Sequence, residues 1–82
     1  MEDLVNHPGH YMAGNIECFD VILESQGIVA TMHYCMCNAM KYIFRHKKKG
    51  GSQDIEKAQW YINQWLELRE ECTDEEWKRY LA

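Results

Sequence analysis

Apolar residues recur at steps of three and four through the middle of this chain, which is the spacing of one face of an α-helix. Within residues 28–47 the spacing selects six side chains: Val29, Met32, Met36, Ala39, Met40 and Ile43. After Ser52 it selects a second set: Ile55, Ala58, Ile62, Trp65, Leu66 and the stem of Arg69. No stretch of useful length alternates apolar and polar residues as a half-buried strand does. The pattern therefore predicts an all-α fold.

Glycines and capping residues predict where the first helices begin and end. Asn15 is a suitable N-cap for a short helix over residues 16–25, and Gly27 ends that segment. A second helix is predicted over residues 28–47, and the glycine pair at 50–51 prevents it from continuing. The connection that follows is so short that the two central helices are expected to form an antiparallel helical hairpin.

Two further signals mark the helices of the second half. Ser52 is expected to cap the second helix of the hairpin, with Asp54 in its first turn. Thr73, followed by Glu76 three residues later, is typical of a capping box and predicts a last helix over residues 74–81. The sequence thus predicts a short N-terminal arm followed by a small bundle of about four helices.

The length of the chain sets the expected organisation. We expect a single domain over residues 1–82, with the arm over 1–15 and helices over 16–82. A domain of this size buries only about 60% of the surface that its unfolded chain exposes, so its own core is small. Four short helices cannot bury all of the large rings, which include Phe44, Trp60, Trp65, Trp77 and Tyr80. Some of these rings are therefore expected in the subunit contacts of a homo-oligomer.

The cysteines and the start of the chain indicate a compartment. The four cysteines are Cys18, Cys35, Cys37 and Cys72. The first residues lack the basic flank and apolar core of a secretory signal, and no apolar run approaches the roughly 18 residues of a membrane span. We therefore expect reduced cysteines in a cytoplasmic protein with no membrane partner.

Charge is distributed unevenly along a chain of formal net charge −4. Six of the nine basic residues lie within one stretch of 17, namely Lys41, Arg45, Lys47, Lys48, Lys49 and Lys57. Six of the thirteen acidic residues lie near the C-terminus, namely Glu67, Glu70, Glu71, Asp74, Glu75 and Glu76. A basic centre on an acidic chain favours a small anionic ligand over a long nucleic acid, which would be repelled elsewhere. Lys47 to Lys49 could equally be an ordinary solvated turn.

The side of the 28–47 helix opposite its apolar stripe carries a line of polar groups. At about 100° per residue, Tyr34, Asn38, Lys41 and Arg45 fall close together on this side. A guanidinium and an ammonium group suit phosphate, a phenol can stack on a base, and an amide can recognise a base or ribose edge. The line could bind a phosphorylated nucleotide, although spacing alone favours an ordinary solvated face.

The N-terminal arm carries His7, His10 and Tyr11 within the run HPGHY. Two histidines three residues apart suggest a zinc hypothesis, but no Cys-x-x-Cys pair accompanies them. On a helix, the thiols of Cys35 and Cys37 would point apart. We expect no metal site here. His10 and Tyr11 suit a lid over a phosphate or a base, or they simply pack the arm against the helices.

The sequence assigns no catalytic residue. There is no Gly-x-x-x-x-Gly-Lys-Ser/Thr loop, and the basic turn over residues 48–52 is only a weak phosphate-binding signal. Glu17 and Asp20, three residues apart, could bind magnesium or act as a base, but such a pair is more often solvated.

Two segments, NHPGHYMAGNIECFDVI and CNAMKYIFRHKKKGGSQDIEKAQWYI, resemble a family of small bacteriophage and prophage domains of unknown function commonly labelled "nucleotide kinase". The family pattern is H-P-x-H-Y, a glycine, I-E-C-I-D, G-N-A-x-K-Y, an arginine, a lysine-rich turn and D-L-x-K-A-x-W-Y. The resemblance covers residues 6–65, which is most of the chain. Cys37 departs from the pattern because the family usually has glycine there, which puts close packing at this position in doubt.

The resemblance implies a phage protein in the cytosol of a host cell with a role in nucleotide metabolism. The family label implies phosphate transfer to deoxynucleoside monophosphates. Nucleotide binding is the part expected to carry over, through His10, Tyr11, Glu17, Asn38, Lys41, Tyr42, Arg45 and Lys57. No intrinsic cofactor is implied, and magnesium would enter only together with a nucleotide. Asn38, Lys41 and Arg45 belong both to this set and to the polar line found from helical spacing.

Two other functions stay open at this point. One is a non-catalytic protein that sequesters a nucleotide or a cyclic-nucleotide immune signal for a phage, an anti-defence role that needs neither a base nor a metal. The other is a protein-interaction module whose basic patch meets an acidic partner. The residues alone do not choose between an enzyme and a binding protein.

Overall fold

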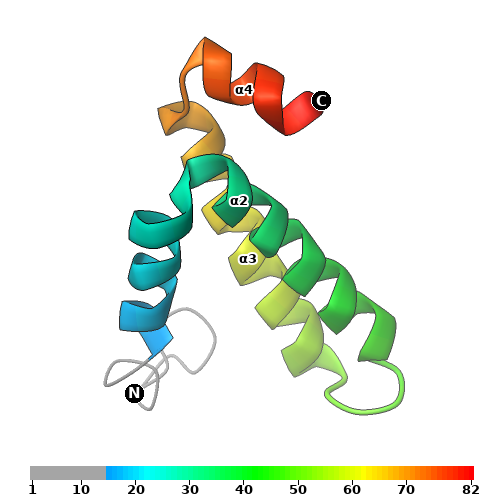
Figure 1. Ribbon diagram of the computed structural model, residues 1–82. Coiled ribbons are helices and arrows are strands. Elements are labelled where there is room, and N and C mark those ends of the chain that lie inside the picture. Colours follow the sequence, from blue (N-terminus) through cyan, green and yellow to red (C-terminus); the bar gives the residue numbers. More distant parts are fainter. Residues whose placement is uncertain (1–14) are drawn as a thin grey trace.

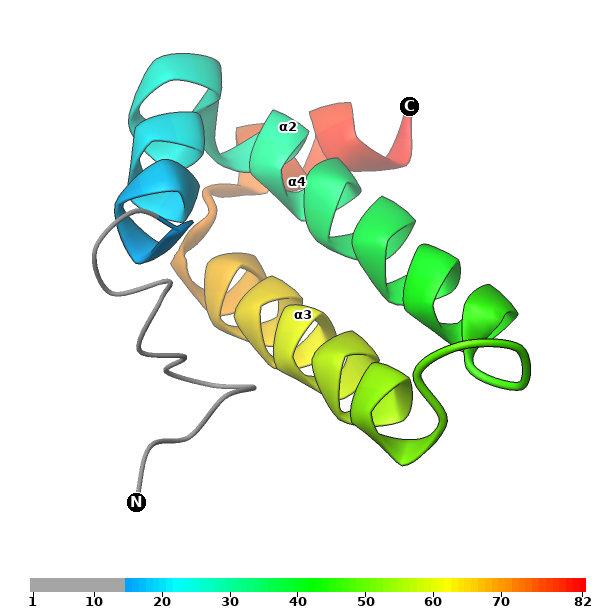
Figure 2. The ribbon, with the colours of Figure 1, turned by 90° about the horizontal axis from the view of Figure 1, so that it is seen from below.

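The computed structural model describes residues 15–82, which form three helices and their connections (Figure 1). Helix α2 spans Asn15–Arg45, α3 spans Ser52–Glu71 and α4 spans Asp74–Leu81. The longer part of α2 pairs with α3 as a hairpin, and α4 crosses one end of it (Figures 1 and 2). None of the described helices is both long and apolar enough to cross a membrane. The predicted all-α fold with a central hairpin is confirmed.

Helix α2 consists of two helical segments that meet at a bend at Gly27. This glycine has φ 88° and ψ 170°, a conformation that is essentially restricted to glycine. The buried Thr31 hydroxyl donates a hydrogen bond to the Gly27 carbonyl at 2.8 Å, which satisfies both groups just after the bend. The predicted break at Gly27 is confirmed, and the two segments account for two of the four expected helices. Figure 2 shows the first segment turning back beside the hairpin.

The turn between α2 and α3 differs in detail from the prediction. Helix α2 ends at Arg45, whose carbonyl accepts hydrogen bonds from the amides of both Lys48 and Lys49 at 3.0 Å. Ser52 is the first residue of α3 and not its cap, because Gly51 occupies the N-cap position without a side-chain hydrogen bond. The cap prediction is wrong because the chain enters α3 through the positive φ of Gly51, 54°, which leaves Ser52 already helical.

Helix α4 begins at the predicted capping box. The Glu76 amide donates to Thr73 Oγ1 at 3.1 Å, and the Thr73 amide donates to Glu76 Oε1 at 2.8 Å. These two bonds satisfy amides that the first turn of a helix otherwise leaves without partners. The prediction of a last helix over residues 74–81 is therefore confirmed, together with the reason for its start.

A row of stacked side chains holds α4 on the hairpin. The Trp77 ring stacks on Tyr80 with centroids 5.4 Å apart, and Arg69 Cζ lies 3.8 Å from the Trp77 ring centroid. Tyr80 also stacks on His33 of α2 at 4.3 Å, and its hydroxyl accepts a hydrogen bond from Trp65 Nε1 at 3.1 Å. Some of the large rings were expected in subunit contacts; Trp65, Trp77 and Tyr80 pack within the chain, whereas Phe44 is 90% exposed.

The buried core lies between the two segments of α2, α3 and α4, and it is small. Its buried centre consists of Met32, Cys35 and Leu68. Around this centre pack partly buried side chains, namely Phe19, Leu23, Ile28, Tyr61, Trp65, Cys72, Trp77 and Tyr80. Ala39 and Ala58 are also buried, and their short side chains allow the two helices of the hairpin to approach closely.

The apolar stripes predicted from the sequence coincide only in part with the buried faces. On α2, Met32 and Ala39 are buried, but Met40 is 68% exposed and Ile43 is 46% exposed. On α3, Ala58 is buried, whereas three members of the stripe are exposed: Ile55, Ile62 and Leu66. The prediction fails because the helices meet along their smallest residues, which rotates part of each apolar stripe out of the contact.

The packing predicts how three of the four free cysteines react. Burial raises the pKa of the Cys35 thiol to about 12, so at about pH 8 only on the order of one molecule in 10⁴ carries the reactive thiolate. Cys18 and Cys37 are exposed, so the departure from glycine at position 37 meets no close packing among the described residues. We expect a maleimide to label both in the native protein and Cys35 only after denaturation, as measured by peptide mass spectrometry. Equal labelling of Cys35 and Cys37 in the native protein would contradict this packing.

Candidate functional site

Three cationic side chains gather around one tyrosine ring on a flank of the hairpin. Tyr42 of α2 is half-buried, and Lys41 Nζ lies 4.5 Å from the centroid of its ring. Arg45 Cζ lies 5.2 Å from the same centroid, and Lys57 Nζ reaches it from α3 at 5.4 Å. Cations at such distances are attracted by the electron-rich face of the ring. We call Lys41, Tyr42, Arg45 and Lys57 the basic cluster.

Tyr61 of α3 fixes the position of the ring at the centre of this cluster. The Tyr61 and Tyr42 rings are stacked, with 15° between their planes and 6.1 Å between their centroids. Tyr61 also contacts Tyr34 edge to face at 5.9 Å and Trp60 at 5.0 Å. Phe19, from the first segment of α2, contacts the rings of both Tyr34 and Trp60. The basic cluster therefore rests on aromatic packing that joins α3 to both segments of α2.

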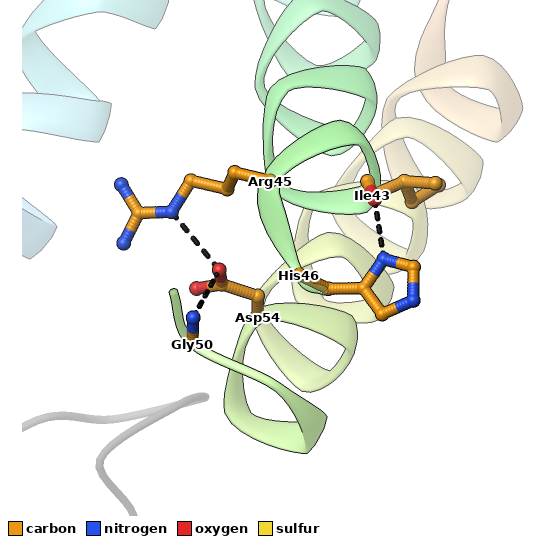
Figure 3. A network of polar contacts seen from close by, with 5 residues as sticks. All are labelled: Ile43, Arg45, His46, Gly50 and Asp54. Carbon is orange, nitrogen blue, oxygen red and sulfur yellow. Dashed lines mark hydrogen bonds and ion pairs between the residues drawn. The ribbon is translucent and has the colours of Figure 1, made fainter. Parts of the chain in front are cut away.

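A buried carboxylate closes the turn end of the hairpin. Asp54 Oδ2 accepts hydrogen bonds from Arg45 Nε at 2.9 Å and from the Gly50 amide at 3.0 Å (Figure 3). The Asp54 side chain is 1% exposed, whereas that of Arg45 is 38% exposed. A Cβ atom on Gly50 would overlap the Asp54 carboxylate, so this close approach requires glycine. We call the contact of these three residues the Arg45–Asp54 latch.

Charge pairing keeps Asp54 ionised although it is buried. Burial by itself raises the pKa of a carboxyl group. The hydrogen bonds from Arg45 and Gly50, with the positive charges of Arg45 and Lys57, outweigh burial and hold the pKa of Asp54 below its usual value. Asp54 Oδ1 is buried without a hydrogen-bond partner among the described residues. The carboxylate neutralises one of the three cations, so the basic cluster keeps a net positive charge.

The structure brings together four of the residues singled out from the sequence, namely the members of the basic cluster. The other two residues of the polar line make structural contacts instead. Asn38 Nδ2 donates a hydrogen bond to the Tyr34 carbonyl at 3.0 Å, and the Tyr34 ring packs among other aromatic side chains. His10 and Tyr11 lie outside the described residues, as does the side chain of Glu17. The polar line is thus divided between the basic cluster and the packing beneath it.

Sequence reasoning missed the part that Asp54 and Gly50 play. Asp54 was expected only as an acidic residue in the first turn of a helix, and Gly50 only as a helix stop. A signal was present, because an arginine and an aspartate stand on opposite sides of a glycine pair at the hairpin turn. A short turn brings such flanking positions together, and opposite charges there can pair across it.

Cationic charge is the chemical property that this site offers. Two ammonium groups and one guanidinium group surround Tyr42, and the guanidinium nitrogens that do not contact Asp54 point away from it (Figure 3). Such groups bind phosphate or carboxylate oxygens through charge-assisted hydrogen bonds. Among the side chains that the structure describes, those of residues 18–82, no group of three or more His, Cys, Asp or Glu is arranged to hold a metal ion.

Comparison with known proteins places the chain in a family. The model of DUF3310, a protein family of unknown function, matches residues 5–63, which include the basic cluster and the latch. The chain is also 36% identical over 75 residues to the gene 1.7 protein of Enterobacteria phage T3, an alignment that covers 85% of this chain. It spans 46% of the length of that phage protein. No solved structure matches the chain. The resemblance to a phage family of unknown function is therefore confirmed, and the chain belongs to the DUF3310 family.

Proposed function

We propose that this chain binds a phosphorylated nucleotide at the basic cluster. The observation that supports this most directly is the gathering of three cations within 4.5–5.4 Å of the Tyr42 ring centroid. Among the described contacts of these cations, one carboxylate, that of Asp54, balances one of the charges. Two positive charges in excess match a phosphate group, which carries up to two negative charges near neutral pH.

The charge of the whole chain favours a small ligand. The chain has a formal net charge of −4, so its positive charge is local. A local positive site attracts a small anion, whereas a long nucleic acid would extend over surface that repels it. A nucleotide is short enough to place its phosphates at the cluster without meeting the acidic C-terminal part.

The members of the cluster have different roles in this proposal. Lys41 is exposed and Lys57 half-buried, and their ammonium groups bind phosphate oxygens. Arg45 contributes only its terminal nitrogens, because its Nε stays on Asp54. Tyr42 positions the cations rather than stacking on a base, since its ring already packs on Tyr61. The proposed phosphate site is therefore chiefly that of the two lysines.

The proposal has two forms, which differ in what happens to the nucleotide. In the first, the chain is a kinase that transfers a phosphoryl group from ATP to a deoxynucleoside monophosphate, with magnesium on the phosphates and the cluster stabilising charge. In the second, it sequesters a nucleotide or a cyclic-nucleotide signal unchanged. Asp54, the carboxylate in contact with the cluster, is occupied by the latch and is not placed to act as a base. This observation favours the second form.

Titration calorimetry with a panel of nucleoside mono-, di- and triphosphates and cyclic nucleotides tests the proposal. We expect at least one member to bind, and Lys41→Ala and Lys57→Ala each to weaken it roughly tenfold, about 1.4 kcal/mol. Lys78→Ala, which removes the same charge from an exposed position on α4, is the matched control and should bind like the wild type. Arg45 is left intact because its replacement would also open the latch.

The same proteins separate the two forms of the function. Incubation with ATP, magnesium and each deoxynucleoside monophosphate should give a diphosphate product if the chain is a kinase, and should return the ligand unchanged if it sequesters. Failure of the whole panel to bind would end the proposal. So would binding that neither lysine substitution weakens.

A further inference from the structure

We propose that two copies of this chain pair through an exposed apolar face of the hairpin and form a four-helix bundle. The face consists of six side chains from both helices: Met40, Ile43, Phe44, Ile55, Ile62 and Leu66. Their exposure ranges from 37% for Ile62 to 90% for Phe44. We call these six residues the apolar face. The proposal does not rest on nucleotide binding and goes beyond it.

The apolar face lies on the side of the hairpin opposite the basic cluster. At about 100° per residue, Met40 and Phe44 lie on one side of the line of buried contacts on α2, and Tyr42 lies on the other. On α3, Ile62 and Lys57 likewise lie on opposite sides of the line of buried contacts. Because the helices are antiparallel, the same sense of rotation leads to the same side of the hairpin on both. The contact between Lys57 and Tyr42 shows that residues rotated in one sense from the buried line meet on the basic side. The apolar residues, rotated in the opposite sense on both helices, therefore meet on the opposite side of the hairpin.

Helix α4 already covers one end of this side. Its Trp77 and Tyr80 contact Arg69 and His33, which lie on the apolar side at the end of the hairpin far from the turn. Toward the turn the same side continues as the apolar face. At the end of the hairpin far from the turn, this side is therefore covered by a helix of the same chain.

The size and composition of the apolar face suit a stable interface. With about 200 Å² for a fully exposed side chain of this size, its six residues expose roughly 700 Å². A standard interface buries about 800 Å² on each partner, whereas the largest apolar patch on a typical monomer is about 300–600 Å². The α3 position between Ile55 and Ile62 on this side is Gln59, which is uncharged. Depletion of charge is characteristic of the centre of an interface.

The charges around the apolar face favour a second copy of this chain as the partner. Lys47, Lys48 and Lys49 lie at the turn end of the hairpin, and acidic residues lie at its other end, namely Glu70, Glu71, Asp74 and Glu75. A two-fold axis that lies in the plane of the apolar face and perpendicular to the helices sets the hairpins antiparallel, with the basic end of each copy beside the acidic end of the other. Two hairpins packed in this way make a four-helix bundle.

Light scattering coupled to size-exclusion chromatography tests the pairing on the full chain without nucleotide. At tens of micromolar we expect twice the chain mass of 9.8 kDa. Phe44→Glu and, separately, Met40→Glu should raise the dissociation constant by a factor on the order of 100, because each charge occurs twice in a symmetric interface. Val21→Glu, at a position 61% exposed on the first segment of α2, is the matched control and should leave the mass unchanged.

Far-UV circular dichroism checks that the variants compared with the wild type are folded. The residues replaced are exposed, so we expect the helical signal of the variants to equal that of the wild type. A wild type that stays monomeric would overturn the proposal. A Phe44→Glu protein that keeps the wild-type mass, or a Val21→Glu protein that dissociates equally, would also overturn it.

Discussion

Replacing Asp54 with alanine is expected to lower the midpoint of thermal unfolding by roughly 10 °C. The substitution leaves the Gly50 amide without its acceptor and removes the partner of Arg45 Nε. Removing one member of a buried pair is costly because the groups left behind lose their compensation. Arg45 is 38% exposed and can be solvated in part, which keeps the loss moderate. Differential scanning calorimetry measures the midpoint.

Two further variants serve as controls for the Asp54→Ala measurement. Ser52→Ala changes an exposed residue of the same turn that makes no capping hydrogen bond, so its midpoint should equal that of the wild type. Asp54→Asn keeps an oxygen for the Gly50 amide but loses the charge, and should lie between the two. If Asp54→Ala unfolds at the temperature of Ser52→Ala, the Arg45–Asp54 latch contributes nothing to stability.

The latch also predicts a dependence on pH. The pKa of Asp54 is lowered in the folded protein, so its contribution is fully present above the unfolded-state pKa of about 3.9. The contribution is lost as the pH falls through the lower, folded-state pKa. The difference in midpoint between the wild type and Asp54→Asn should therefore shrink only in acid below about pH 4.

Replacing Trp77 with alanine is expected to reduce the free energy of unfolding by about 3 kcal/mol. The ring lies between Arg69 and Tyr80 and also contacts Trp65 edge to face at 6.2 Å. Its loss removes the centre of the row that holds α4 on the hairpin. The ring is only half-buried, which places the effect at the lower end of the range for such substitutions. Urea denaturation followed by circular dichroism measures the change.

The control for Trp77 lies in the same helix. Leu81 is 63% exposed, so Leu81→Ala removes apolar atoms from α4 without disturbing the row, and should change the free energy by no more than about 0.5 kcal/mol. Equal losses for the two variants would mean that the ring stacking does not anchor α4.

Local signals in the sequence predicted the helices well. The break at Gly27 and the capping box of Thr73 and Glu76 depend on a few neighbouring residues, so they can be recognised without knowing the fold. The cap assigned to Ser52 failed for a local reason, the positive φ of Gly51. Boundaries were thus predictable to within one or two residues.

The faces of the helices were harder to predict than their ends. Met40 and Ala39 are adjacent members of one stripe, yet one is 68% exposed and the other 2%. Which of them faces α3 depends on the partner helix, whose small Ala58 allows a close approach. The burial of Asp54 was also hidden, because hydrophobic spacing gives no weight to a carboxylate that gains its partners from the turn.

The positions of the candidate site were predictable in part. Lys41 and Arg45 are one helical turn apart, so their proximity followed from helical spacing. Lys57 comes from the other helix, and its place beside Tyr42 depends on the register of the hairpin, which the Arg45–Asp54 latch helps to set. The family resemblance supplied Tyr42 and Lys57, which periodicity did not bring together.

The bend at Gly27 allows the first segment of α2 to pack on the rest of its own chain. A straight helix over all 31 residues of α2 would be about 46 Å long, which exceeds the greatest extent of the molecule, 38 Å. In that form Phe19 would be carried away from Trp60 of its own chain, and the contact between the two rings would be lost. One backbone conformation, available to glycine, therefore lets the first helical segment return to its own chain and complete the aromatic packing beneath the basic cluster.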